Sequence, residues 1–284
     1  MNILKKNYLI GLLSGLLLII IIIDQNIVNH IAINYKSIGF LLMPIGFLLF
    51  AQAFKNSSIL THNFCMSQVY ASLILPLMGL APYLIPYSSH EVIDPTLKLL
   101  DSMMFFNVAN FMSWFQVHPI LNDFFWHIYN LFLPQILLTF LVLPFFDFEG
   151  VQKFYIWTLM TFIIMMVFTY FYPSVSPCYS YHGFNFSKSL TKEADQFILI
   201  KNHLSHISIT DDVSCPSYHV VMALCIIHSW INIRRFFINK IIIVINILMI
   251  ISTLTTGSHY LTDVIAGIIL FYSCFLMLNT LEKK

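Results

Sequence analysis

The sequence predicts an all-α integral membrane protein, a bundle of about eight transmembrane helices. Of its 284 residues, 58% are hydrophobic and only 10% are charged, and the mean hydropathy is +0.81. A soluble domain of this size has too little interior to hide that much apolar surface, so a bilayer is the expected solvent. The apolar residues also gather in segments of membrane-spanning length. The net charge of +1 gives no reason to expect nucleic acid as a partner.

The apolar segments follow one another along most of the chain. In order, we place them at Tyr8–Ile23, Ile38–Phe54, Phe64–Pro86, Phe124–Phe146, Phe154–Tyr172, Ser217–Ile233, Phe237–Thr255 and His259–Leu278. The first follows Lys5 and Lys6 and ends at Asp24 without a small-residue cleavage site. We therefore expect a retained anchor there rather than a signal peptide.

The stretch between the third and fourth segments has a different character. Met103 to Phe115 is rich in Met and Phe, but Asn107, Asn110 and Ser113 interrupt it. This composition is typical of a short helix that lies in the membrane interface. A loop helix packed on the bundle fits it equally well.

The distribution of basic residues sets the orientation. With eight spans, both termini share one side of the membrane, and that side carries nine Lys and Arg residues: Lys5, Lys6, Lys55, Lys153, Arg234, Arg235, Lys240, Lys283 and Lys284. The other side carries five in longer loops: Lys36, Lys98, Lys188, Lys192 and Lys201. The first side is therefore expected to be cytoplasmic. We expect a multi-pass protein of a bacterial inner or plasma membrane, with the loop Pro173–Cys215 facing outward.

A histidine and an aspartate stand at the start of the last apolar segment, in GSHYLTDVIAG at Gly257–Gly267. His259 and Asp263 are four residues apart, so they lie on one face of a helix. Charge near a membrane is costly, and an ionisable pair there indicates a functional site. We expect the carboxylate to accept a proton from one imidazole nitrogen and fix the tautomer, which leaves the other nitrogen free to attack.

A second polar cluster, SCPSYH at Ser214–His219, opens the sixth segment. The sixth and eighth segments run in the same direction, so His219 and His259 fall at the same outward end. His219 is then placed to act as general acid for a leaving group.

The starts of these two helices favour an anion. Ser214 or Cys215 is expected to cap the sixth segment, and Ser258 or Thr256 the last. The free backbone N–H groups and the positive dipole end at each start attract phosphate, and the hydroxyls of Ser217 and Ser258 add donors. The arrangement predicts phosphoryl transfer through a phosphohistidine, without a metal or another cofactor.

Two motifs resemble the type 2 phosphatidic acid phosphatase superfamily of membrane enzymes. Pro216–His219 matches the family's middle motif, Pro-Ser-x-His. Ser252–Asp263 matches its last motif, Ser-Arg-x5-His-x3-Asp, except that Thr253 stands in place of the arginine. The two motifs occur in the family's order, with its spacing and on one side of the membrane.

The resemblance implies a role for each residue. His259 would be the nucleophile, Asp263 its orienting partner and His219 the acid. The six-helix catalytic core would occupy residues 59–284, preceded by a pair of helices in residues 1–58. The substrates would be phospholipids or lipid alcohols in the membrane.

The departures from the family pattern bear on the substrate. The family's first motif, a Lys and an Arg-Pro pair, is expected near the end of the fifth segment, which reads YFYPSVSPCYSY without Lys or Arg. An arginine clamp helps most with the dianion of a monoester, whereas a diester carries one charge. The pattern is similar to the sphingolipid-synthase branch, which includes inositol phosphorylceramide synthase. That branch implies an inositol-phosphotransferase-like reaction. The alternative is a lipid phosphate phosphatase, in which Lys188, Lys192 or Lys201 supplies the missing charge.

Two other classes of protein remain open at this stage. A secondary transporter uses intramembrane ionisable residues, but the paired broken helices and internal repeats typical of transporters are not visible. A bis-histidine haem protein would need facing histidines, but neither the aspartate nor PSYH.

The cysteines suggest one covalent link. Cys178 and Cys215 flank the outward loop and would face an oxidising compartment, so we expect a disulfide between them. Cys65, Cys225 and Cys274 lie within apolar segments and are expected to stay reduced.

Overall fold

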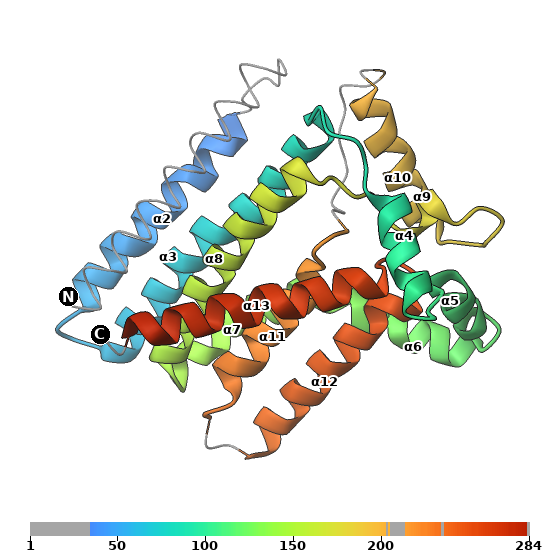
Figure 1. Cartoon of the computed structure of the whole chain (residues 1–284). Helices are drawn as coiled ribbons and strands as arrows, with labels where there is room; N and C mark the ends of the chain where they lie inside the picture. Colours follow the sequence, from blue (N-terminus) through green and yellow to red (C-terminus); the bar gives the residue numbers. More distant parts are fainter. Residues whose placement is uncertain (1–34, 203, 205–213, 234–235, 283–284) are drawn as a thin grey trace.

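The computed structural model describes residues 35–202, 204, 214–233 and 236–282, and Figure 1 shows their arrangement. These residues form helices and connecting loops without a strand, which confirms the all-α membrane bundle. The first expected span, Tyr8–Ile23, and the retained anchor lie outside the described residues. The division into residues 1–58 and 59–284 stays a prediction.

The first half of the described chain contains two long helices and a group of shorter ones. They are α2 (Tyr35–Phe54), α3 (Ile59–Leu80) with its 3₁₀ extension η1 (Ala81–Tyr87), α4 (Asp94–Met103), α5 (Val108–Gln116), α6 (Pro119–Asn130), α7 (Phe132–Val142) and η2 (Leu143–Phe145). The second half contains α8 (Phe148–Phe171), α9 (Pro177–Ser180), α10 (Lys188–Lys201), α11 (Tyr218–Trp230), α12 (Phe236–Thr255) and α13 (Leu261–Glu282).

Three described helices are long and apolar enough to cross a membrane: residues 148–171, 237–255 and 261–280. A fourth span would consist of α6 and α7 together, which meet at a bend of 45°. Pro134 explains the bend, because proline lacks an N–H and its ring clashes with the carbonyl four residues earlier, here that of Asn130. Two further apolar helices, Met43–Phe54 and α11, are shorter.

The short helix α11 lies at the centre of the bundle. It packs against α7, α8, α12 and α13, and Figure 1 shows it beneath the long helix α13. Its side chains Val220, Val221 and Met222 are fully buried. Tyr218 Oη donates to the Thr158 carbonyl of α8 at 2.9 Å, and Trp230 Nε1 donates to Thr139 Oγ1 of α7 at 3.2 Å. A helix buried on all sides holds its first residues in a fixed place.

The stretch that was expected to lie in the interface forms the last residue of α4, a turn and nearly all of the short helix α5. Asn107 caps α5 by accepting the Asn110 N–H at 3.0 Å. Val108 and Ala109 are buried against the bundle, while Phe105 and Trp114 are exposed. One face of this segment thus packs on the protein and the other is apolar and open.

Gly267 permits the close approach of α13 to α11. A Cβ atom at this position would lie 2.7 Å from the Ser217 carbonyl oxygen, which belongs to backbone and cannot rotate away. We expect Gly267→Ala to lower the free energy of unfolding by about 1–3 kcal/mol. Thermal unfolding in detergent measures this. Gly79→Ala is the control, because a Cβ there meets nothing within 4 Å and alanine favours the helix. Equal melting temperatures for the two variants would contradict the packing argument.

Candidate active site

The structure brings His219, His259 and Asp263 together where α11 and α13 begin. His219 is the second residue of α11, His259 precedes α13 by two residues, and Asp263 lies in the first turn of α13. The two chain segments are joined by a backbone hydrogen bond from Ser217 N to Asp263 O at 3.1 Å. The sequence motifs therefore converge in space as their spacing predicted.

The ring of His259 is held by both of its nitrogens. Its Nε2 lies 3.4 Å from His219 Nδ1, and its Nδ1 lies 3.0 Å from the Ser214 carbonyl oxygen. Only 4% of the side chain is exposed. A carbonyl can only accept, so Nδ1 carries the proton and Nε2 presents its lone pair toward His219.

Asp263 does not accept the imidazole proton directly, as the sequence led us to expect. Its Oδ2 lies 3.6 Å from His259 Nδ1, farther away than the Ser214 carbonyl. The carboxylate is fully buried and its Oδ2 accepts the Tyr260 N–H at 2.9 Å and the Ser214 hydroxyl. The carboxylate thus acts on the imidazole through its charge and through Ser214, while the carbonyl fixes the tautomer.

The ring of His219 lies against two aromatic side chains. Tyr129 stacks on it with ring centroids 4.4 Å apart and planes at 20°, and the centroid of Phe132 lies 4.1 Å away. These residues flank the break between α6 and α7. Neither residue was predicted from the sequence, because a Tyr and a Phe within an apolar run carry no functional signal.

The start of α13 is already occupied by carboxylates. Asp101, from α4, accepts the N–H groups of Leu261 and Thr262 at 2.9 and 2.8 Å, and also the Thr262 hydroxyl at 2.6 Å. Asp263 takes the Tyr260 N–H, as the third residue of a helix does in a capping box. These N–H groups are therefore already paired in the structure, and phosphate binding at this helix start stays a prediction. The helix begins at Leu261, so neither Thr256 nor Ser258 is the residue before it.

The expected cap of α11 also differs. The residue before this helix is Ser217 rather than Ser214 or Cys215. The hydroxyl of Ser217 is fully buried and has no hydrogen-bond partner among the described residues. The hydroxyl of Ser258, in contrast, pairs with Thr256 Oγ1 at 3.0 Å. Of the two serines predicted to bind phosphate, only Ser217 keeps its hydroxyl available in the described structure.

A third buried aspartate, Asp94, lies beside Tyr260. It accepts the N–H groups of Val175 and Ser176 at 2.9 and 3.0 Å, and the Tyr260 hydroxyl at 3.2 Å. Ser174 in the same stretch accepts the Cys215 N–H at 2.7 Å. The segment in which the family's basic motif was expected thus builds hydrogen bonds around the histidines instead of supplying a cation.

The three lysines of the outer loop are not brought to the histidines. Lys188 and Lys192 are exposed on α10, which packs on α9 and η1. Lys201 donates to the carbonyl oxygens of Ser88 and His90. Among the described residues, no group of His, Cys, Asp and Glu is arranged to hold a metal ion.

The structure contains no disulfide between Cys178 and Cys215, and the expected bridge stays a prediction. Cys178 Sγ lies 2.9 Å from Ser176 Oγ, whereas Cys215 is buried beside Asp263. Burial, together with the neighbouring carboxylate of Asp263, raises the pKa of the Cys215 thiol. The two sulfur atoms are therefore held by different neighbours.

Comparison with known proteins adds one finding. The family model described as the PAP2 superfamily matches residues 95–277, which run from α4 into α13 and include both histidines. A search of curated proteins and a search of solved structures each gave no match.

The burial of Asp94 predicts a pH dependence of stability. Burial raises the pKa of its carboxyl from 3.8 to about 7, although the Val175 N–H favours the charged form. A raised pKa in the folded state means that Asp94 stabilises the fold in its protonated form, so its contribution is lost as pH rises from 3.8 to about 7. Asp94→Asn should flatten the fall in melting temperature across this range.

Thermal unfolding at a series of pH values measures the effect. Asp123→Asn is the control, because Asp123 is an exposed aspartate on α6. Parallel curves for the wild type and Asp94→Asn would show that Asp94 does not titrate in this range.

Proposed function

The chain belongs to the PAP2 superfamily, and we propose that it transfers a phosphorylated lipid headgroup through a phosphohistidine at His259. Membership supports a membrane enzyme of the phosphatase or phosphoryl-transfer class that acts on lipid phosphates. One observation carries the finer proposal. The His259 ring has its Nδ1 fixed by a backbone carbonyl at 3.0 Å, and its Nε2 faces a second histidine at 3.4 Å.

The reaction proceeds in two displacements. In the first, His259 Nε2 attacks phosphorus, the bond to the leaving oxygen breaks, and His219 gives its proton to that oxygen. In the second, an incoming hydroxyl attacks the phosphohistidine and gives its proton to His219, and the P–N bond breaks. The buried carboxylate of Asp263 stabilises the positive charge that develops on the His259 ring.

The first displacement requires the two rings to separate. Their nitrogens are 3.4 Å apart, which leaves no space for a phosphorus atom and its oxygens between them. His259 is the fixed partner, because the Ser214 carbonyl holds it. His219 moves by sliding across Tyr129, whose ring lies parallel to it within 20°.

Neutral donors bind the phosphate in this proposal. They are the first backbone N–H groups of α11, which have no partner within the helix, and the buried hydroxyl of Ser217. Because Ser217 is the residue before α11, its hydroxyl lies beside these N–H groups. It gains a hydrogen-bond partner when a phosphate oxygen binds there. Lys188, Lys192 and Lys201 have no part in this arrangement.

The charge of Asp263 favours a monoanion. This carboxylate is fully buried and its Oδ2 lies 3.6 Å from His259 Nδ1. It repels a phosphate dianion about twice as strongly as a phosphodiester of charge −1 at the same distance. We therefore favour a phosphodiester phospholipid as donor and a lipid alcohol as acceptor, an inositol-phosphotransferase-like reaction. The lipid phosphate phosphatase is the second candidate, since the same two histidines serve it. In either case the site faces the non-cytoplasmic side.

The proposal predicts distinct defects for the two histidines. His259→Ala should abolish turnover and the phosphohistidine, which mass spectrometry of rapidly quenched protein detects. His219→Ala should lower the rate by ~10²–10⁴-fold with a lipid substrate, the usual contribution of a general acid. A substrate with a nitrophenol leaving group needs no acid, so it should restore the first step in His219→Ala but not in His259→Ala.

His228→Ala is the matched control. His228 also lies on α11, but its Nδ1 bonds the Leu224 carbonyl at 2.9 Å and its ring packs against Phe271 of α13, away from the His219–His259 pair. Wild-type turnover by purified His259→Ala would rule out the phosphohistidine.

The proposal also predicts the preferred substrate. In one detergent, a diester phospholipid with a ceramide or diacylglycerol acceptor should give a new phosphorus-containing lipid that depends on the acceptor. A lipid alcohol held at the membrane interface has a high effective concentration and so competes well with water. Phosphatidic acid is the comparison substrate. Rapid release of inorganic phosphate from it, without an acceptor-dependent product from any diester tested, would leave the phosphatase as the function.

A further inference from the structure

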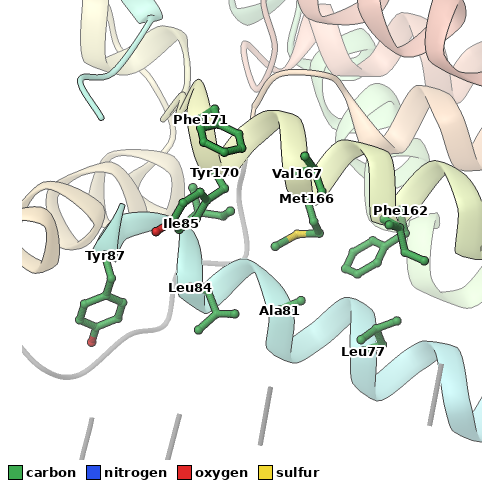
Figure 2. A pocket seen from close by; sticks show the side chains of 11 residues that line it. Leu77, Ala81, Leu84, Ile85, Tyr87, Phe162, Met166, Val167, Tyr170 and Phe171 are labelled. Carbon is green, nitrogen blue, oxygen red and sulfur yellow. The ribbon is translucent and has the colours of Figure 1, made fainter. Parts of the chain in front are cut away.

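A groove between α3 with η1 and the last turns of α8 lies apart from the histidines. It has a volume of about 410 Å³, and Figure 2 shows its side chains lining the space between the two helices. Leu77 and Phe162 lie at one end, Leu84 and Val167 in the middle, and Tyr87 at the other end. The catalytic side of α8 is a different face, on which Thr169 donates to the Cys215 carbonyl at 3.3 Å.

The groove opens toward the surface that the bilayer covers. The helix α8 is one of the candidate spans, and Val167 at the groove's rim is 56% exposed. Except for the phenol groups of Tyr87 and Tyr170, the lining side chains are hydrocarbon or thioether. An apolar groove on this surface is filled by what the bilayer contains, which is acyl chain.

One end of the groove carries a positive charge. Lys201 donates to the carbonyl of Ser88, which directly follows Tyr87, at 3.0 Å, and to the carbonyl of His90. The ring of His90 lies 5.3 Å from that of Phe171, which lines the groove. The ammonium therefore lies at the tyrosine end.

The two carbonyls use two of the three N–H donors of Lys201 and leave one for a further acceptor. Burial lowers the pKa of this lysine, and a neighbouring anion would oppose that shift. Glu91, next to His90, is exposed to solvent.

We propose that this groove holds one acyl chain of an anionic membrane phospholipid, whose phosphate binds Lys201. The apolar length of the groove accepts the chain, the phenols of Tyr87 and Tyr170 lie at the level of the ester and headgroup, and the ammonium neutralises the phosphate. The lipid would contact α8, η1 and α10, and so stabilise the packing of α10 against the bundle. This site is independent of the proposed function, because it needs only the membrane environment.

Photolabelling tests the site by binding alone. The full chain is reconstituted in phosphatidylcholine vesicles with a small fraction of phosphatidylglycerol that carries a diazirine on one acyl chain. After irradiation, the label should concentrate on peptides from η1 and the end of α8. Val167→Trp, which fills the groove from its rim, should remove that label. Val244→Trp is the matched control, since Val244 is similarly exposed on the span α12 but does not line the groove.

The charge is tested separately. Lys201→Gln should weaken labelling by the phosphatidylglycerol probe about tenfold, the usual loss for one charge-assisted hydrogen bond, and Lys201→Arg should retain it. Lys192→Gln, exposed on the same helix, should label as the wild type does.

Ile163→Trp, at another point of the groove, replaces Val167→Trp if that variant does not fold. Label spread evenly over all spans, or unchanged in Val167→Trp, would overturn the acyl-chain site. Equal labelling by a phosphatidylcholine probe would overturn the role of Lys201. Activity enters none of these readings, so their failure says nothing against the phosphohistidine.

Discussion

The site depends on the hydrogen bonds between the Asp101 carboxylate and the start of α13. This carboxylate lies 160 residues before Leu261 and takes the first two backbone N–H groups of the helix. A helix start buried without acceptors would be unstable, so the bond fixes where α13 begins. This determines the positions of two residues: Asp263 in the first turn of α13, and His259 just before the helix. Gly267 then allows α13 to lie close to Ser217 at the start of α11. This close approach brings His219, the second residue of α11, to His259.

The same bonds determine the electrostatics of the site. Asp94, Asp101 and Asp263 are buried near the start of α13, and none of them forms a salt bridge with a lysine or arginine in the described part of the chain. Asp94 and Asp101 are satisfied by backbone N–H groups and hydroxyls, and burial raises the pKa of both. The carboxylate nearest to His259, that of Asp263 at 3.6 Å, is placed to stabilise a positive charge on the imidazole ring. Under the proposed mechanism that charge develops when His259 attacks phosphorus, whereas a second negative charge on the substrate is opposed.

The sequence predicted those parts of the site that depend on periodicity and hydropathy. The four-residue spacing of His259 and Asp263, and the common direction of two spans, brought the three residues together as expected. The sequence could not predict that Asp101 and Asp94 are buried, because an aspartate between two apolar segments is usually exposed to solvent. The bond between His259 and the Ser214 carbonyl could not be predicted either, since every residue has a backbone carbonyl and the residue type gives no signal. Pro134 could have indicated the bend between α6 and α7. It was not predicted, because the apolar residues continue without interruption across the bend.

Thr253, which stands in place of the family's arginine, is packed inside the bundle. Thr253 is fully buried, its hydroxyl bonds the Ile250 carbonyl at 2.7 Å, and its carbonyl accepts the His259 N–H at 3.2 Å. If the site binds phosphate as we propose, it does so through neutral donors, each worth less than a charged one. The proposed transfer then relies on the bilayer to concentrate the lipid alcohol against water.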